Sequence, residues 1–357
     1  MTIIIAIDSL KGCLTSEEAN GAAREALLRT GAGIVTLPVS DGGEGFLTAM
    51  HAARGGRMVE CEVADPLMRP IRARYLISEE RHAVIELAQA SGLGLLSPGE
   101  RNPLTTSSYG TGQLIADALR HGATNITIGL GGSATSDCGR GLLQALEGTD
   151  LTGVCLLLAT DVRNPLLGPQ GAARVFAPQK GADEAMVEEL ERRAHLFARE
   201  SALRCGHDYS DAPGAGAAGG VGYALMQYFG ARCMSGAELV LDATRFDAHL
   251  RDAALVITGE GHADRQTLMG KLPSVVLARA RRYGIPVWLV AGQVSDAETL
   301  RDVGFSRVLR ITPETMPTDE AVRPDVARRN LTDTLAACRA DAVALLPARP
   351  DDHPQHS

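Results

Sequence analysis

Aromatic side chains are scarce in this sequence, which has one Trp, six Tyr and six Phe among 357 residues. Its core must therefore be built mainly from Ala, Val, Leu and Ile. No run approaches the roughly 20 apolar residues that a membrane-spanning helix needs. The start of the chain also lacks the basic segment and long apolar run of a signal peptide. These absences predict a cytoplasmic protein with no membrane partner.

Cysteine is neither paired nor clustered in the chain. The seven cysteines are scattered, and none forms a Cys-x-x-Cys pair, which argues against a zinc site and against a disulfide framework. The formal net charge is −8, and no cluster of Lys and Arg stands out, so nucleic acid is not an expected partner. A few local cations can still bind an anionic substrate.

Glycine, by contrast, is abundant, with 39 residues. Together with short aliphatic runs, this composition favours an α/β fold, in which parallel strands are covered by helices. A strand is expected at residues 2–8, and the sequence Thr15-Ser16-Glu17-Glu18 predicts a capped helix start. A second strand at 34–39 leads directly into another helix. This order is typical of a doubly wound sheet.

The middle of the chain has a different pattern. Residues 58–63, 71–77 and 83–87 are expected to be strands joined by short turns, as in an antiparallel meander. From residue 254 the alternation of strands and helices returns. We therefore predict a flavodoxin-like parallel-sheet domain from residues 1–56 and 246–346, and a mixed α/β domain inserted at 57–245. The Pro-, Asp- and His-rich tail at 347–357 is predicted to be disordered.

Two glycine-rich segments follow predicted strands, where open α/β sheets bind ligands. In residues 40–45, glycines let the backbone approach an anion, although Asp41 and Glu44 could instead cap a helix. Residues 129–137 combine glycines and hydroxyls with Asp137, which suits a cradle for phosphates with a metal-binding carboxylate nearby. This second segment lacks the Lys-Ser/Thr ending of a Walker A loop.

Charged residues follow other predicted strands. Asp8, Ser9 and Lys11 place an acid, a hydroxyl and a cation after the first strand, where they could orient a hydroxyl and hold an anion. Asp161 ends a later strand and is a candidate for Mg²⁺ or for a hydroxyl. Lys180, further along, is a candidate phosphate contact. Turn residues at the surface are the alternative for both.

The segment at 259–271 carries the densest set of candidates. Glu260, Asp264, Gln266 and Lys271 lie between flexible glycines. Phosphoryl transfer needs such an inventory, because carboxylates serve Mg²⁺ or the attacking hydroxyl and cations serve the transferred group. The residues therefore favour an enzyme that handles phosphate and a small anion.

These segments, taken in order, resemble the bacterial glycerate kinases of the sugar-acid and glyoxylate pathways. The similarity covers the chain from Ile3 to about Leu345 and rests on the motifs DSLKG, PVSDGGEGF, SYGTGQLI, GLGGSATSDCG, DVRNPLLG, FAPQKGA, PGAGAAGGVG and ITGEGHADRQTLMGK. The resemblance implies phosphorylation of D-glycerate by ATP with Mg²⁺, usually giving 2-phosphoglycerate. It also implies that the inserted domain has a restriction-endonuclease-like core.

The expected catalytic residues are four charged side chains. Lys11 and Lys271 would hold the carboxylate of glycerate, and Asp8 or Asp264 would accept the proton of the attacking hydroxyl. Positioning and charge neutralisation should supply most of the rate in such a transfer. Which of the two carboxylates is the base stays open at this point.

The remaining candidates would bind metal, phosphate or substrate. Asp137, Asp161 or Asp41 would hold Mg²⁺, and the turn at 131–133 would cradle phosphate. The substrate- and phosphate-binding candidates are Ser9, Asp41, Gly42, Gly43, Glu44, Gly131, Gly132, Ser133, Lys180, Glu260 and Gln266.

Three other functions are weighed against this one. A kinase of another small hydroxy acid fits the same residues. An NAD(P)-dependent oxidoreductase is suggested only by the glycine string from Gly214 to Gly219, which follows no predicted strand and so lacks the context of a dinucleotide fingerprint. A sensor that binds a sugar acid would leave the many Asp, Lys and hydroxyl groups unexplained. The position that is phosphorylated and the oligomeric state, with a homodimer as one option, stay open.

Overall fold

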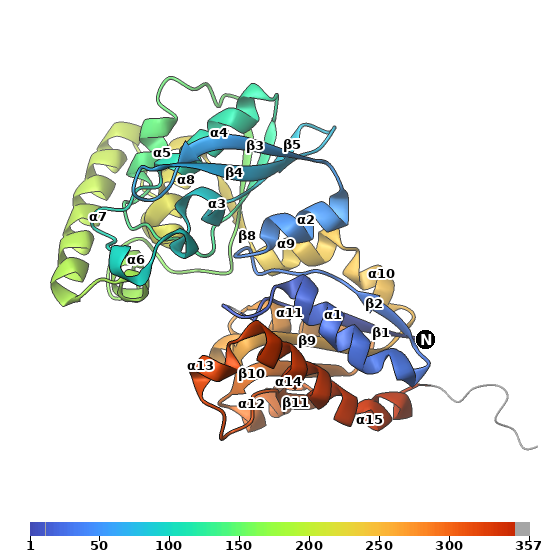
Figure 1. Cartoon of the computed structure of the whole chain (residues 1–357). Helices are drawn as coiled ribbons and strands as arrows, with labels where there is room; N and C mark the ends of the chain where they lie inside the picture. Colours follow the sequence, from blue (N-terminus) through green and yellow to red (C-terminus); the bar gives the residue numbers. More distant parts are fainter. Residues whose placement is uncertain (11, 347–357) are drawn as a thin grey trace, which may run out of the picture. The chain divides into compact units, whose positions relative to one another are not determined.

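The computed structural model describes residues 1–10 and 12–346, in which the chain forms two compact units (Figure 1). Unit 1 contains residues 1–40 and the chain from residue 241 onward, and unit 2 contains residues 41–240. The boundaries expected from the sequence, at 57 and 245, differ from these, and helix α2 (Phe46–Arg54) belongs to unit 2. The tail predicted to be disordered, 347–357, and Lys11 lie outside the described residues. Over the described ranges, no helix is both long and apolar enough to cross a membrane.

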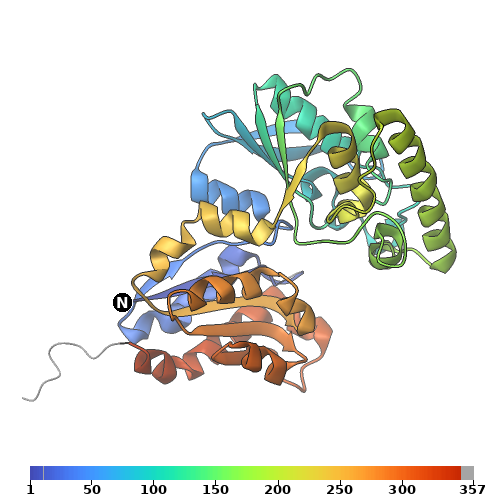
Figure 2. The ribbon, with the colours of Figure 1, turned by 180° about the vertical axis from the view of Figure 1, so that it is seen from behind.

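Unit 1 is built on a five-stranded sheet in which every paired strand is parallel. Aliphatic side chains of the central strands, such as Ile3, Ile5 and Ile7, are fully buried. Helices α1 and α14 cover one face of the sheet and α11 covers the other (Figures 1 and 2). The strands, in spatial order, are β2 (Gly33–Thr36), β1 (Thr2–Ile7), β9 (Ala253–Ala263), β10 (Val287–Val294) and β11 (Arg307–Arg310).

The first helix of unit 1 begins as the sequence predicts. Thr15 Oγ1 accepts the N–H of Glu18 at 3.2 Å, and the N–H of Thr15 donates to the Glu18 carboxylate at 2.9 Å. This reciprocal capping box is confirmed. The α-helices of this unit are α1 (Ser16–Leu27), α10 (Phe246–Leu250), α11 (Leu272–Arg281), α12 (Ala297–Val303), α13 (Thr318–Ala321), α14 (Pro324–Ala337) and α15 (Arg339–Ala344), with 3₁₀ turns η1 (Leu28–Thr30) and η6 (Arg265–Leu268). Helix α9 (Gly236–Ala243) contains the second unit boundary.

Unit 2 is built on a six-stranded mixed sheet. Its first three strands form the predicted antiparallel meander, and its last four are mutually parallel. The last strand, β8, was not expected from the sequence. The strands, in spatial order, are β3 (Arg57–Ala64), β4 (Pro70–Ile77), β5 (His82–Glu86), β6 (Asn125–Gly129), β7 (Cys155–Ala159) and β8 (Arg232–Met234).

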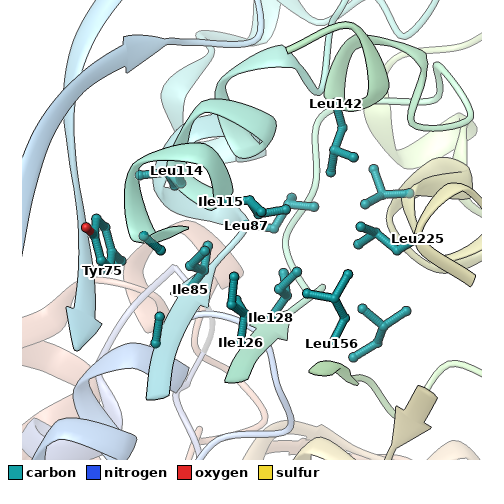
Figure 3. Packing of buried hydrophobic residues seen from close by; sticks show 14 of the residues in the cluster. Tyr75, Ile85, Leu87, Leu114, Ile115, Ile126, Ile128, Leu142, Leu156 and Leu225 are labelled. Atoms are coloured by element: carbon teal, nitrogen blue, oxygen red, sulfur yellow. The ribbon is translucent and has the colours of Figure 1, made fainter. Parts of the chain in front are cut away.

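Apolar side chains hold helices onto this sheet. Ile85 and Ile126 of the strands point toward Leu114 and Ile115 of α4, and Leu225 of α8 packs in the same cluster (Figure 3). This packing fixes the strands whose carboxyl ends carry the loops described below. Besides α2, the helices are α3 (Ala88–Ser91), α4 (Tyr109–Arg120), α5 (Arg140–Ala145), α6 (Ala172–Phe176), α7 (Glu184–Cys205) and α8 (Val221–Phe229), with 3₁₀ turns η2 (Leu93–Leu95), η3 (Pro98–Glu100), η4 (Pro178–Lys180) and η5 (Ala217–Gly220).

The glycine string near residue 219 has a packing role. Its turn η5 has left-handed backbone at Gly219 (φ 65°) and Gly220 (φ 94°). A Cβ on Gly219 would overlap the carbonyl of Thr135, and one on Gly220 would lie 2.7 Å from Cys138 Cα. The glycines therefore allow two backbone segments to pack closely, which agrees with rejecting a dinucleotide fingerprint.

Candidate active site

Three loops of unit 2 meet where the parallel strands β5, β6 and β7 end. The N–H of Gly131 donates to the carbonyl of Gly42 at 3.1 Å. A Cβ on Gly42 would lie 2.6 Å from the carbonyl oxygen of Ala159, so only glycine fits between the loops. The structure thus brings the segments 41–44, 131–133 and 159–161 together at one sheet edge, where α/β sheets commonly bind ligands.

Glu86, the last residue of β5, anchors the first of these loops. It is buried, and its carboxylate accepts the N–H of Leu47 at 3.0 Å, close to the start of α2. Burial raises the pKa of Glu86, and the N–H groups of Leu47 and Gly45 partly oppose that rise. Glu86 was not among the residues predicted for the site. Its only signal in the sequence is that it is the one acid within the otherwise apolar run 83–87.

Removing the Glu86 carboxylate should destabilise the protein. In Glu86→Ala, the N–H groups that point at the carboxylate lose their acceptor, so we expect the free energy of unfolding to fall by about 1–3 kcal/mol. Glu86→Gln keeps an acceptor oxygen and should change it by less than about 1 kcal/mol. The exposed Glu79→Ala, a control on a turn, should stay within about 0.5 kcal/mol of the wild type. Denaturant unfolding measures all three, and equal stability of Glu86→Ala and wild type would contradict the anchoring role.

The loop at 41–45 is not a side-chain cap of α2, although Asp41 and Glu44 left that alternative open. Gly45, which has no side chain, occupies the N-cap position with φ 84°. Asp41 Oδ1 instead accepts the N–H of Gly43 at 3.0 Å. The left-handed turn at Gly45 separates the two acids from the first helical turn, so the capping interpretation is wrong.

Asp137 lies beneath the glycine-rich loop and is held by the protein itself. Its Oδ2 accepts the N–H and the hydroxyl of Ser108, each at 2.8 Å, and the N–H of Gly141 at 3.1 Å. Its Oδ1 accepts the N–H of Gly139 at 3.0 Å. Both oxygens are thus engaged in shaping the turn before α5. These bonds do not support the expected metal-binding role for Asp137, because Mg²⁺ would have to replace them.

Lys180 lies behind the same loop, and its side chain is almost wholly buried, with 2% of the residue exposed. Its Nζ donates to Ser133 Oγ at 2.9 Å and to the carbonyl of Thr135 at 2.6 Å. Burial lowers the pKa of Lys180 to about 7. Lys180 therefore stabilises the loop through hydrogen bonds to Ser133 and Thr135.

Asp161 follows β7 at the same edge, beside the first residues of α9. Burial raises the pKa of Asp161 to about 6, and the neighbouring Asp41 carboxylate acts in the same direction. Hydrogen bonds from Ser235 and from the N–H groups of Gly236 and Ala237 oppose this rise. Its Oδ2 is buried and has no hydrogen-bond partner within the described residues. A cation at this point would compensate both carboxylates.

In unit 1, Asp8 and Ser9 follow the central strand β1, next to the strand that carries Glu260. The N–H of Asp8 donates to the carbonyl of Gly259 at 3.0 Å, and the N–H of Ser9 donates to Asp8 Oδ1 at 2.7 Å. Asp8, Ser9 and Glu260 are all buried. The structure therefore brings together residues predicted from segments 250 positions apart in the chain.

A buried polar pair on α1 positions the end of β1. Asn20 Oδ1 accepts the N–H of Ile7 at 2.9 Å, and its Nδ2 donates to the carbonyl of Leu37 at 3.1 Å. Ser16 Oγ donates to the carbonyl of Ile7 at 2.6 Å. These bonds fix the backbone just before Asp8. Sequence reasoning missed both residues, because Ser and Asn inside a helix carry no specific signal of such a contact.

The segment 259–271 folds around the buried Glu260. Thr267 Oγ1 donates to this carboxylate at 2.6 Å, and Lys271 Nζ lies 3.3 Å from it. Burial raises the pKa of Glu260, opposed by both partners. Asp264 caps the turn η6, with Oδ1 accepting the N–H of Gln266 at 2.7 Å. Lys271 is thus paired with the Glu260 carboxylate. The Gln266 side chain is exposed.

The two units therefore carry two distinct polar sets. Unit 2 combines glycine-rich backbone, the Ser133 hydroxyl and the Asp41 and Asp161 carboxylates, which suits phosphate and a divalent cation. Unit 1 combines buried acids with Lys271, which suits a small hydroxy acid and the transfer of its proton. Within the residues that the structure describes, no three His, Cys, Asp or Glu side chains form a metal cluster.

Comparison with known proteins gives consistent matches. Residues 3–152 and 148–341 match the model of the Glycerate kinase family. The chain is 40% identical over 354 residues to a glycerate kinase of Bacillus subtilis (90% of this chain, 93% of the relative). It is 40% identical over 374 residues to the glycerate 2-kinase of Escherichia coli (94% and 98%). The crystal structure of a proposed glycerate kinase 2 from Salmonella typhimurium LT2 superposes with a TM-score of 0.77 at 38% identity, covering 97% of this chain and 98% of that one.

Proposed function

Because the chain belongs to the glycerate kinase family, we propose that it transfers the γ-phosphoryl group of ATP to D-glycerate. We assign the 2-hydroxyl as the acceptor, which gives 2-phosphoglycerate. The observation that carries the proposal is the 40% identity to a glycerate 2-kinase over 94% of this chain. The family match over residues 3–152 and 148–341 also includes the loops of both polar sets. A kinase of another small hydroxy acid is the alternative that the same loops would serve.

The architecture supports the same family assignment. Numbered along the chain, the five strands of unit 1 have the spatial order 2-1-3-4-5, which is the flavodoxin-like order. We accordingly assign unit 1 as a flavodoxin-like domain. The mixed sheet of unit 2 supports an inserted domain, for which the family resemblance implies a restriction-endonuclease-like core.

We assign the phosphates of ATP to the edge of unit 2. The backbone of 42–43 and 131–132 offers close approach, because these positions have no side chains. Ser133 Oγ accepts a hydrogen bond from Lys180, so its own hydrogen can be donated to an anion. Donors fixed before the ligand arrives stabilise developing charge without reorganisation.

Mg²⁺ fits the carboxylates of the same edge. Asp161, with a buried oxygen that has no hydrogen-bond partner among the described residues, and Asp41 beside it would hold the ion. Mg²⁺ commonly takes one or two protein carboxylates and completes its shell with water and substrate phosphates. When bound, the ion neutralises charge on the β- and γ-phosphates. Asp137 is not included, since its oxygens already accept four hydrogen bonds.

We assign the hydroxy acid to the edge of unit 1. Lys271 would bind the carboxylate of glycerate, together with Lys11 of the DSLKG motif. Asp8 is the proposed base, because it is buried at the end of the central strand, whereas Asp264 is partly exposed and caps a turn. Asp8 would accept the proton of the attacking hydroxyl late in the transfer.

A coupled assay with D-glycerate, ATP and Mg²⁺ tests this function, and ³¹P NMR of the product identifies the phosphorylated position. We expect one ADP per phosphoglycerate and the 2-phosphate isomer. If ATP is consumed with another hydroxy acid but not with D-glycerate, the assignment of D-glycerate as the substrate is wrong and the assignment as a kinase still holds. Formation of the 3-phosphate would reject only the position.

A further inference from the structure

Lys180 is a buried cation without a carboxylate partner. No Asp or Glu oxygen lies within ion-pair distance of Nζ in the described part of the chain, and both of its partners, Ser133 Oγ and the Thr135 carbonyl, are uncharged. Burying a charge in this way is costly unless a counter-charge compensates it. A ligand bound at the loop would therefore have to supply the compensating negative charge.

The hydrogen bonds give a direct path from Lys180 to such a ligand. Nζ fills an acceptor position of Ser133 Oγ, so the hydroxyl can donate its own hydrogen to another acceptor, such as an anion on the loop. Hydrogen bonds in such a chain strengthen one another, and more so when the first donor is charged. An anion on the loop would thus favour the protonated form of Lys180.

The charged neighbours of Lys180 do not replace this ligand. Asp137, in the same loop, favours the protonated form, but its oxygens are taken up by other donors. Arg101 belongs to the segment packed on the next residue, Gly181, where a Cβ would lie 2.6 Å from the Arg101 carbonyl. Arginine is always protonated, so it adds positive charge and cannot supply the balance.

We propose that binding of an anion at the 131–135 loop is coupled to uptake of one proton by Lys180. This inference rests on the proposed function for the identity of the anion, the polyphosphate of ATP. In the empty protein near neutral pH, Lys180 exchanges between –NH₂ and –NH₃⁺. Bound phosphate draws a proton from solvent onto Nζ, and no other bond changes. Lys180 is on this account a positioning residue, and nucleotide affinity falls as the pH rises.

The direction of the pH dependence follows from the linkage between proton binding and anion binding. Burial brings the pKa of Lys180 in the free protein to about 7. A bound anion raises this pKa, so the complex holds more protons than the free protein above pH 7. Affinity for ATP should accordingly weaken by up to about 10-fold per pH unit at pH 8 and above.

Calorimetry of ATP binding at pH 8 in buffers of different ionisation enthalpy measures the uptake. At this pH a phosphate monoester, with a pKa of about 6, is almost fully ionised, so it contributes little. With Mg²⁺ at the same concentration throughout, we expect the wild type to take up roughly one proton more than Lys180→Met. Lys180→Arg, always charged, should bind ATP without this uptake and without the loss of affinity above pH 8.

These measurements distinguish a failure of the proton coupling from a failure of the proposed kinase function. Equal proton uptake by wild type and Lys180→Met, or wild-type affinity that does not change from pH 7 to 9, would overturn the coupling. If Lys180→Met fails to fold, as judged by circular dichroism, the wild-type pH series and Lys180→Arg decide. The D-glycerate assay on the same wild-type preparation is read independently. Turnover without Lys180-dependent uptake rejects only the coupling, and uptake without turnover rejects only the proposed function.

Discussion

Asp8→Asn should lower the turnover of D-glycerate by about 100-fold or more, the scale of a lost general base. Asparagine keeps an oxygen that can accept the N–H of Ser9, as Asp8 Oδ1 does at 2.7 Å. The backbone at the end of β1 should therefore keep its position, held in addition by Asn20. The amide cannot take the proton of the attacking hydroxyl, so the loss should appear in kcat at saturating ATP and glycerate.

Asp264→Asn is the matched control for this result. Asparagine caps helices as well as aspartate does, so the bond from the Gln266 N–H should persist. We expect turnover within about 10-fold of the wild type, since this variant loses charge but not the proposed base. The opposite ranking would assign the base to Asp264. Near-normal turnover of both variants would exclude each as the base.

Gly131→Ala should raise the KM for ATP by about 10-fold or more, equivalent to about 1.4 kcal/mol, and should destabilise the protein by about 1–3 kcal/mol. A Cβ at this position would overlap Gly43 Cα and lie 2.9 Å from Gly43 N. The loops would have to separate, and the bond between the Gly131 N–H and the Gly42 carbonyl would lengthen or break. Initial-rate kinetics over a range of ATP concentrations and denaturant unfolding measure the two effects.

Gly21→Ala provides a control with the same chemical change. Gly21 is exposed within α1, and a Cβ there would meet nothing within 4 Å. Alanine is favoured over glycine in a helix, so this variant should be more stable by about 0.5–1 kcal/mol with an unchanged KM. If Gly131→Ala behaved like Gly21→Ala, close contact of the two loops would not be required for binding ATP.

Much of the fold could be predicted because it depends on local signals. The capped start of α1 and the meander of β3 to β5 follow from residue types at short spacing, and both are confirmed. The strand β8 and the helices α8 and α9 were missed. Strand β8 has only three residues, and α8 follows a glycine string that by itself favours irregular backbone.

The placement of polar groups was harder to predict because it depends on tertiary contacts. The loop at 41–45 reads as part of the first domain, yet a single buried acid at the end of β5, Glu86, ties it to unit 2. Lys180 reads as a phosphate contact or as a residue of a surface turn, because lysine is rarely buried. Asp137 reads as a metal ligand. Their hydrogen-bond partners come from segments that no local pattern connects to them.

The interleaved order of the units has a consequence for synthesis on the ribosome. Unit 2 is one continuous stretch, so all of its strands have been made once residue 240 has emerged. Strand β1 must wait longer, because its partner β9 begins at residue 253 and the pairing joins positions about 250 residues apart. During that interval the apolar strand Ile3–Ile7 lacks the central neighbour that buries it. Nascent chains should therefore depend on chaperones most strongly at Ile3–Ile7, which are made long before their partner strand.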